Sequence, residues 1–270
     1  DLARAKSASA TSGKPIFLLF QEVPGCAGCK EFGRTVLSHA LLKEAVESAF
    51  EPVVVFNNQA GADKAVLEAF REPAWNYQVV RFLDAAGKDL IPRKDRIWTV
   101  DGVAGRMIAA LQAAGRPVPN YLRAVQANAA VGTQKEVAFA MACFWTGEAR
   151  IGGIPGVIAT EAGWLDNREV TRVRFDAKRL SIEALATAAK AADCAKKSYS
   201  AKQIAAGYRP AQASDQKRQL TGVNLSGVKN LTPMQLTKLN ALYRVDREAA
   251  LTWLSPTQVQ TLEQGANSTR

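Results

Sequence analysis

Short, mostly apolar runs alternate with amphipathic stretches in the first 115 residues. Three runs have the length and the β-branched or aromatic content of buried strands, namely Ile16–Phe20, Val53–Phe56 and Val79–Leu83. The stretches between and after them carry apolar residues at helical spacing, and we expect helices over Cys29–Phe50, Ala62–Phe70 and Val100–Ala114. Alternating strands and helices indicate an α/β domain. The small, polar residues 1–13 are expected to form a flexible leader.

A second set of elements follows the Gly- and Pro-containing run Gly115–Asn120, where the composition changes. Glu136–Ala140 and the alternating Val170–Phe175 are predicted strands, and Ser181–Ala192 is an alanine-rich predicted helix. We therefore expect three parts along the chain: a first α/β domain over 1–125, a small second α/β domain over 126–200, and a helical extension over 201–270 that packs on the second domain.

The helical extension contains two matching helix starts. Thr232 and Ser255 are each followed directly by Pro, and a Gln stands three residues after each of them. This pattern predicts a helical hairpin. Its first helix is expected to bury one apolar side, formed by Leu236, Leu239, Leu242 and Tyr243.

The overall composition, with 47% hydrophobic and 22% charged residues, is typical of a soluble globular protein. No apolar run approaches the roughly 20 residues that span a bilayer, so we expect no stable membrane insertion. The chain begins with Asp1, which fits a mature chain left by signal-peptide removal and fits a trimmed chain equally well. We expect a periplasmic or otherwise exported protein. Its oligomeric state does not follow from the sequence.

The net charge of +10 is uneven along the chain. From Lys196 to the end, 11 Lys or Arg stand against 4 Asp or Glu. This region has neither a basic patch interleaved with aromatic residues nor a nucleic-acid-binding motif. We therefore expect a solvated basic surface and no nucleic-acid partner.

Two of the four cysteines form a CxxC motif, Cys26 and Cys29, between a predicted strand and a predicted helix. The N-terminus of a helix offers free backbone N–H groups and a partial positive charge, both of which favour a thiolate over a thiol. We expect Cys26 to be the accessible thiol of low pKa and Cys29 to be the protected one. The arrangement indicates thiol chemistry.

The first 115 residues resemble the thioredoxin-like family of thiol–disulfide oxidoreductases in this strand, in the CxxC at a helix start and in the later strand and turn Arg81–Lys88. The lead-in Val23-Pro24-Gly25-Cys26 is similar to a subgroup in which the first redox residue can be selenocysteine. The resemblance implies that Cys26 is the attacking thiolate and Cys29 the resolving thiol. Gln78 stands where the family has a proline facing the CxxC, which leaves a metal-binding or weakened redox site open.

The segment from Glu136 to about Cys194 resembles a shortened peptide-methionine sulfoxide reductase of the A type. The resemblance rests on Cys143-Phe144-Trp145 after a run of small residues and on Glu169 in a later strand. It implies that Cys143 attacks the sulfoxide, that Phe144 and Trp145 line the methyl pocket, and that Glu169 donates the proton. Trp164 replaces a tyrosine of the family's substrate pocket.

Cys194 falls where that family has a pocket aspartate, so we expect Cys143 and Cys194 to lie within disulfide reach. A disulfide needs Cα atoms roughly 4.4–6.8 Å apart. Three interpretations stay open: a structural bridge, a redox-active pair that exchanges with Cys26 and Cys29, and two unrelated buried thiols. Glu148, one turn after Cys143, is expected to be a charge on the helix surface.

Metal binding is the remaining alternative for the cysteine pairs. Two thiolates can hold Cu(I), a soft ion that prefers sulfur ligands. His39 is the only histidine, so a Cys/His zinc finger is excluded by the number of histidines. We expect His39 to lie at the surface.

The sequence therefore predicts an exported thiol–disulfide oxidoreductase with an α/β fold that acts on a thiol or disulfide protein partner. We expect no cofactor for this activity, and Cu(I) only if a cysteine pair binds copper. The alternatives are a methionine sulfoxide reductase with a thioredoxin-like domain as built-in reductant, and a thiol-based copper-binding protein.

Overall fold

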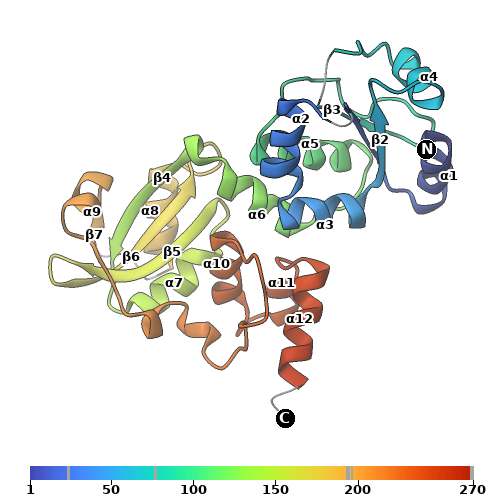
Figure 1. Cartoon of the computed structure of the whole chain (residues 1–270). Coiled ribbons are helices and arrows are strands. Elements are labelled where there is room, and N and C mark those ends of the chain that lie inside the picture. Colours follow the sequence, from blue (N-terminus) through green and yellow to red (C-terminus); the bar gives the residue numbers. More distant parts are fainter. Residues whose placement is uncertain (23–24, 76–77, 193–194, 196, 268–270) are drawn as a thin grey trace. The chain divides into compact units, whose positions relative to one another are not determined.

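A computed structural model gives the fold of the chain and describes residues 1–22, 25–75, 78–192, 195 and 197–267. The chain divides into two compact units, Asp1–Gln126 and Ala127–Arg270. Each unit has its own sheet (Figure 1). None of the helices within the described residues is long and apolar enough to cross a membrane.

Within the described residues, the sheet of the first unit has three strands in the order β2-β1-β3. Their bounds are β1 (Ile16–Gln21), β2 (Glu51–Phe56) and β3 (Val79–Leu83). The central strand β1 is parallel to β2 and antiparallel to β3. Its residues Ile16–Phe20 are all buried, which explains why this strand is continuously apolar in sequence.

Helices cover both faces of this sheet. They are α1 (Leu2–Ser12), α3 (Ala40–Ala49), α4 (Ala62–Ala69), α5 (Val100–Ala113) and α6 (Asn120–Ala129). Phe17, Leu19 and Phe82 pack against α3, α5 and α6 on one face. Leu18 and Phe20 pack with α1 and α4 on the other.

The flexible leader expected over residues 1–13 is wrong, because these residues form helix α1. The Asp1 side chain accepts hydrogen bonds from the first free N–H groups of the helix, at 2.8 Å from Ala3 N. Gly13, at φ 70°, ends the helix in a left-handed conformation. Ala5 and Ser9 form its buried side. Such small side chains carry little hydrophobic signal, and the sequence pattern therefore does not predict a helix here.

The single helix expected over Cys29–Phe50 is also wrong. The chain forms α2 (Ala27–Phe32), continues as a π-helical segment (Gly33–Leu37) and breaks before α3. The Ser38 hydroxyl donates to the Arg34 carbonyl at 2.5 Å, and His39 is extended. His39 is half-buried rather than on the surface, and burial lowers its pKa.

The second unit contains an antiparallel sheet of five strands in the part of the chain that the structure describes, in the order β7-β4-β6-β5-β8. Their bounds are β4 (Gln134–Ala140), β5 (Val157–Leu165), β6 (Arg168–Asp176), β7 (Lys197–Tyr199) and β8 (Arg209–Pro210). A tight turn joins β5 to β6 through Asp166 and Asn167, which have φ values of 50° and 54°. Asp and Asn tolerate this left-handed conformation better than most residues.

Helices α7 (Phe144–Gly153) and α8 (Ile182–Ala191) cover one face of this sheet, where Val137, Phe139 and Phe175 are buried. The short helix α9 (Ala201–Gly207) covers Ala138 and Val170 on the other face. The second unit is therefore a second α/β layer structure, with the C-terminal helices added to it.

The C-terminal helices are α10 (Pro233–Leu242), α11 (Arg247–Leu251) and α12 (Pro256–Asn267). The two helix starts expected at Thr232 and Ser255 are confirmed. Gln235 Oε1 accepts from Thr232 N at 2.9 Å, and Gln258 Oε1 accepts from Ser255 N at 3.0 Å. The two glutamines also meet, at 2.7 Å from Gln235 Nε2 to Gln258 Oε1, so the caps hold the helices together.

The buried side of α10 differs from the expected one. Leu239 is fully buried, but Leu236 and Leu242 are only partly so, whereas Thr237 and Lys238 are buried. Lys238 Nζ donates to the carbonyls of Gly152 and Ile154 at 2.7 and 2.9 Å, at the end of α7. Burial lowers the pKa of Lys238 to about 8. The buried Lys238 side chain of α10 therefore joins this helix to the end of α7.

Candidate functional site

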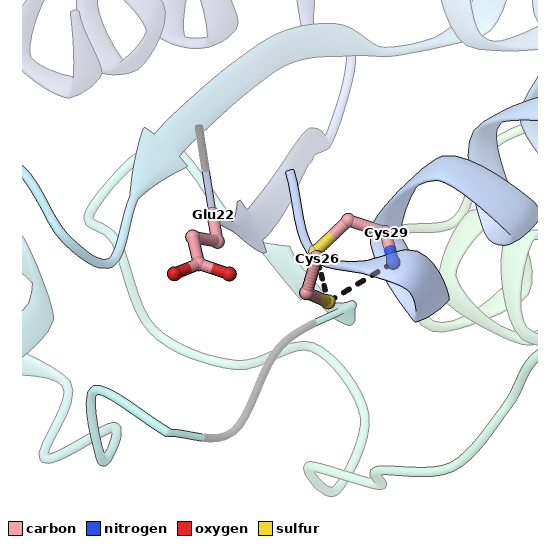
Figure 2. A group of neighbouring side chains, drawn as sticks. All are labelled: Glu22, Cys26 and Cys29. Atoms are coloured by element: carbon pink, nitrogen blue, oxygen red, sulfur yellow. Dashed lines mark hydrogen bonds between the residues drawn. The ribbon is translucent and has the colours of Figure 1, made fainter. Parts of the chain in front are cut away.

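The CxxC lies between the end of β1 and the start of α2. Cys26 is the N-cap of α2, and its Sγ accepts a hydrogen bond from Cys29 N at 3.2 Å. The two sulfurs are 3.0 Å apart and are not joined in a disulfide. Figure 2 shows the pair at the start of the helix. The strand and the helix start thus bring two sulfurs together at free backbone N–H groups.

Gln78 faces both sulfurs from the position directly before β3, the antiparallel neighbour of β1. Its Nε2 lies 2.8 Å from Cys29 Sγ and 3.3 Å from Cys26 Sγ. Phe20 pairs with Val79, so Gln78 falls beside the end of β1, where the CxxC loop begins. Its φ is 58° and its exposed fraction is 7%. The expectation that Gln78 occupies the position facing the CxxC is confirmed.

The two thiols differ in exposure and in pKa. Burial by itself raises the pKa of Cys26, but hydrogen bonds from the Cys29 thiol, from backbone N–H groups and from Gln78 outweigh it, and the pKa is lowered. Burial raises the pKa of Cys29, and so does donating its S–H to Cys26. Cys26 is partly exposed and Cys29 is buried. The geometry agrees with Cys26 as the accessible thiol of low pKa.

Glu22 is a third member of this cluster. One of its carboxylate oxygens and the two sulfurs all lie within 4.8 Å of one another (Figure 2). Glu22 follows β1 directly, so the end of the strand sets its position. Glu22 is not among the site residues predicted from the sequence. The available signal was its place at the same strand end as the CxxC loop.

In the second unit, the structure brings Cys143, Phe144 and Glu169 together. Cys143 is the N-cap of α7, and Glu169 Oε2 accepts a hydrogen bond from Phe144 N at 2.8 Å. Gly147 makes this approach possible, because a Cβ there would lie 2.2 Å from Thr171 Oγ1. The close packing of α7 on β6 therefore places the carboxylate at the helix start.

Three aromatic side chains surround this helix start. The Phe144 ring meets the Trp145 and Trp164 rings edge-on, at centroid distances of 5.9 and 5.7 Å. The Arg218 guanidinium lies over Trp145 at 4.9 Å. Trp145 Nε1 is buried and has no hydrogen-bond partner among the described residues. Trp164 is 38% exposed, so the cluster reaches the surface.

Cys194, the remaining cysteine selected from the sequence, lies outside the described residues, as does its neighbour Asp193. The expected disulfide reach between Cys143 and Cys194 therefore stays a prediction. The same holds for the three interpretations of that pair.

The surface position expected for Glu148 is wrong, because this carboxylate is fully buried. It accepts from Lys217 N at 2.8 Å and forms an ion pair with the Lys217 ammonium, and Thr160 Oγ1 lies 3.5 Å away. Lys217 is 69 residues further along the chain, so local spacing carried no sign of this pair.

The second unit also contains a cavity of about 420 Å³ beside β5 and β6. Arg172 lines it and forms ion pairs with Glu136 and Glu161, at 2.7 and 3.3 Å. Cys143 and Glu169 are not among the described residues that line it. The cavity and the Cys143 cluster are therefore separate features.

Two comparisons with known proteins found matches. Residues 1–85 match a family model described as thioredoxin-like. A solved structure titled "DsbH Oxidoreductase" is similar at 20% sequence identity and a TM-score of 0.35, covering 41% of this chain and 81% of that chain. No curated protein matches. The family match, the β2-β1-β3 sheet and the CxxC at α2 define the first unit as a thioredoxin-like domain.

The chain is thus an α/β protein with a thioredoxin-like domain, a second α/β sheet region and C-terminal helices. The likeness of the second unit to the sulfoxide reductases stays a prediction.

Proposed function

We propose that this chain is a thiol–disulfide oxidoreductase whose reactive pair is Cys26 and Cys29. The observation that carries the proposal is the placing of two cysteine sulfurs 3.0 Å apart at a helix start. Gln78 donates to both of them. The backbone N–H of Cys29 and the side-chain N–H of Gln78 stabilise negative charge on sulfur. A nucleophilic thiolate requires this stabilisation.

The chemistry follows from the different settings of the two sulfurs. The Cys26 thiolate attacks a substrate disulfide, the substrate S–S bond breaks, a mixed disulfide forms on Cys26, and the leaving sulfur takes a proton from solvent. Cys29 then loses its proton and attacks the Cys26 sulfur. The second substrate thiol leaves, and the pair ends as a disulfide. Two electrons have passed to the substrate, and the reverse steps oxidise a dithiol.

The raised pKa of Cys29 suits this order of events. While Cys26 is a thiolate, the Cys29 S–H donates to it and stays protonated. Once Cys26 is bound in the mixed disulfide, its sulfur carries no charge, and the Cys29 proton is no longer held in this way. The resolving attack therefore becomes favourable only after the first step.

The test uses single cysteine variants of the full chain in exchange with a protein disulfide. Cys26→Ser should reduce the rate to that of the uncatalysed reaction, and Cys29→Ser should accumulate a mixed disulfide that mass spectrometry detects. Cys143→Ser is the matched control and should exchange like the unmodified chain. In the unmodified chain, alkylation at mildly acidic pH should label Cys26 first. A Cys26→Ser variant that still exchanges at the full rate refutes the proposal.

We place this activity in the periplasm or in another exported location. Disulfides persist in such oxidising compartments, where a thiol–disulfide exchanger finds its protein partners. Fractionation of cells that make the natural protein tests this, and recovery in the cytosol alone contradicts it.

Methionine sulfoxide reduction at Cys143 is a second candidate function. The hydrogen bond that holds Glu169 at the start of α7, beside Cys143, favours it, together with the Phe144, Trp145 and Trp164 rings. In this reaction the Cys143 thiolate attacks the sulfoxide sulfur and Glu169 protonates the sulfoxide oxygen. The S–O bond then breaks, and the oxygen passes as hydroxyl to the Cys143 sulfur as the thioether leaves. The products are a thioether and a sulfenic acid on Cys143.

A single-turnover assay separates this candidate from the first. The fully reduced chain, without external thiol, is mixed with a methionine sulfoxide peptide. Loss of turnover in Cys143→Ser and Glu169→Gln, with Cys26→Ser still able to turn over once, supports a separate sulfoxide site. If Cys26→Ser limits the second turnover only, the first unit acts as the built-in reductant. No turnover by the unmodified chain refutes the candidate.

A further inference from the structure

Glu22 has no role in the exchange reaction, yet its carboxylate shares a small space with both reactive sulfurs. One oxygen of Glu22 and the sulfurs of Cys26 and Cys29 lie within 4.8 Å of one another. Glu22 is half-buried and forms no ion pair with any residue that the structure describes. An unpaired carboxylate beside a thiolate adds like charge and therefore opposes the thiolate. A cation between the three groups would remove this repulsion.

The sulfurs are surrounded by hydrogen-bond donors. Cys26 accepts from the backbone N–H groups of Gly28 and Cys29. Cys29 accepts from the backbone N–H of Glu22, and Gln78 Nε2 donates to both sulfurs. Such donors stabilise excess negative charge on sulfur, which is the charge that thiolates keep when they ligate a metal.

We propose that the reduced Cys26–Cys29 pair and Glu22 form a binding site for Zn²⁺. Zn²⁺ takes thiolate and carboxylate ligands, and two cysteines separated by two residues are a usual ligand spacing. Zn–S bonds of about 2.3 Å at a tetrahedral angle place two sulfurs roughly 3.8 Å apart. The sulfurs are 3.0 Å apart in the structure, so the distance between them needs to increase by less than about 1 Å. Three protein ligands leave the fourth position open.

The carboxylate selects Zn²⁺ over Cu⁺. Cu⁺ is a soft ion that two thiolates satisfy, and a carboxylate oxygen is a poor ligand for it. Two thiolates and one carboxylate carry three negative charges, of which Zn²⁺ neutralises two. The remaining charge lies on sulfurs that already accept N–H hydrogen bonds. The third ligand thus changes the metal preference expected for a cysteine pair alone.

Zn²⁺ binding and disulfide formation exclude each other, a consequence that rests on the proposed exchange function. Binding requires both thiols to lose their protons. Oxidation by a partner disulfide joins the two sulfurs, passes two electrons to the partner, which takes up two protons, and releases Zn²⁺. Bound Zn²⁺ therefore competes with oxidation for the two thiolates, and we expect it to slow exchange.

The experiment uses the full chain, reduced and freed of metal under argon. Zn²⁺ affinity is measured by competition with a chromophoric chelator, and Co²⁺ serves as a spectroscopic probe of thiolate ligation. We expect one ion per chain and a thiolate-to-Co²⁺ charge-transfer band. Glu22→Gln should weaken Zn²⁺ binding by at least about tenfold. Glu31→Gln, which changes an exposed carboxylate of helix α2, should bind like the unmodified chain.

Cu⁺ affinity, measured by competition in the same variants, separates ligation from charge. Glu22→Gln should leave Cu⁺ binding nearly unchanged. An equal loss for both ions shows that Glu22 acts only through its charge and overturns the proposal, as does the absence of one-to-one Zn²⁺ binding. Exchange activity is assayed separately with excess chelator. A chain that exchanges there without binding Zn²⁺ overturns the metal site alone. A chain that binds Zn²⁺ but never exchanges overturns the proposed function alone.

Discussion

Cys26 and Cys143 occupy the same local position, directly before a helix that follows a strand, but the two helix starts are used differently. At α2 the N–H of Cys29 donates to Cys26 Sγ at 3.2 Å. At α7 the N–H of Phe144 donates to Glu169, and Cys143 makes no capping hydrogen bond. At these two helix starts, the cysteine sulfur therefore accepts hydrogen bonds from the free backbone N–H groups only where no carboxylate from another strand accepts them instead.

The two helices also differ in how they are anchored. Helix α7 is held at its start by Glu169, in its middle by the buried Glu148 and at its end by Lys238. In contrast, the ion pair between Glu31 of α2 and Arg34 of the following π-helical segment is largely exposed, with side-chain exposures of 57% and 73%. We therefore expect changes along α7 to alter stability and changes at the start of α2 to alter reactivity.

The largest expected effect is the loss of the buried Glu148 carboxylate. Glu148→Ala leaves the Lys217 ammonium, which is 19% exposed, without its partner and should lower the free energy of unfolding by about 3–5 kcal/mol. Glu31→Ala breaks an exposed pair and should cost less than about 1 kcal/mol. Urea unfolding of both variants measures the difference. Equal losses would show that α7 is no more firmly anchored than α2.

Lys238 should make stability depend on pH. Burial lowers its pKa to about 8 in the folded chain, against 10.5 when unfolded. Between these values the unfolded state binds more protons, so the free energy of unfolding rises with pH, by up to about 3 kcal/mol. Below pH 8 both states are protonated and this gain is absent.

Lys238→Met removes the titrating group and is the reference for this measurement. The stability of the unmodified chain relative to Lys238→Met should increase from pH 8 to pH 10. A difference that is constant or falls over this range would mean that the carbonyls of Gly152 and Ile154 compensate fully for burial.

Elements with strong local signals could be predicted from the sequence. The mostly apolar β1 and β3 were expected within one residue of their bounds, because nearly all of their residues are buried. The helix starts at Thr232 and Ser255 follow from side chains that hydrogen bond to backbone three residues away. The position of Gln78 followed from the register of β3. These features depend on interactions within a few residues or on one repeated pattern.

Features made by distant residues could not be predicted in this way. Helix α1 buries small side chains that lack a hydrophobic signal, and Glu148 meets a lysine 69 residues away. Glu22 joins the sulfurs because a strand end and a helix start converge in space. One signal was present but not used: Asp166-Asn167, a pair suited to positive φ, marks the turn after the unpredicted strand β5.

Gln78→Ala tests whether the amide stabilises the Cys26 thiolate. Loss of its N–H donor should raise the lowered pKa of Cys26, so the thiolate forms only at higher pH. A hydrogen bond to a charged group is worth about 1.5–3 kcal/mol at most sites, so alkylation at mildly acidic pH should slow by about tenfold. The rate is followed by mass spectrometry. Gln59→Ala, at an exposed glutamine, is the control, and an unchanged rate in Gln78→Ala would assign the lowered pKa to the helix start alone.

The smallest expected effect is at Cys143, where Glu169→Ala would make the second helix start more like the first. The variant frees the Phe144 N–H and removes a negative charge beside the thiol. Helix-start interactions of 0.3–1 kcal/mol correspond to alkylation of Cys143 faster by about two- to fivefold. Loss of the cap should also cost about 1 kcal/mol of stability. Glu183→Ala, in the exposed first turn of α8, controls for the change in charge. Slower alkylation of Cys143 in Glu169→Ala would show that the carboxylate activates the thiol rather than competing with it for the helix start.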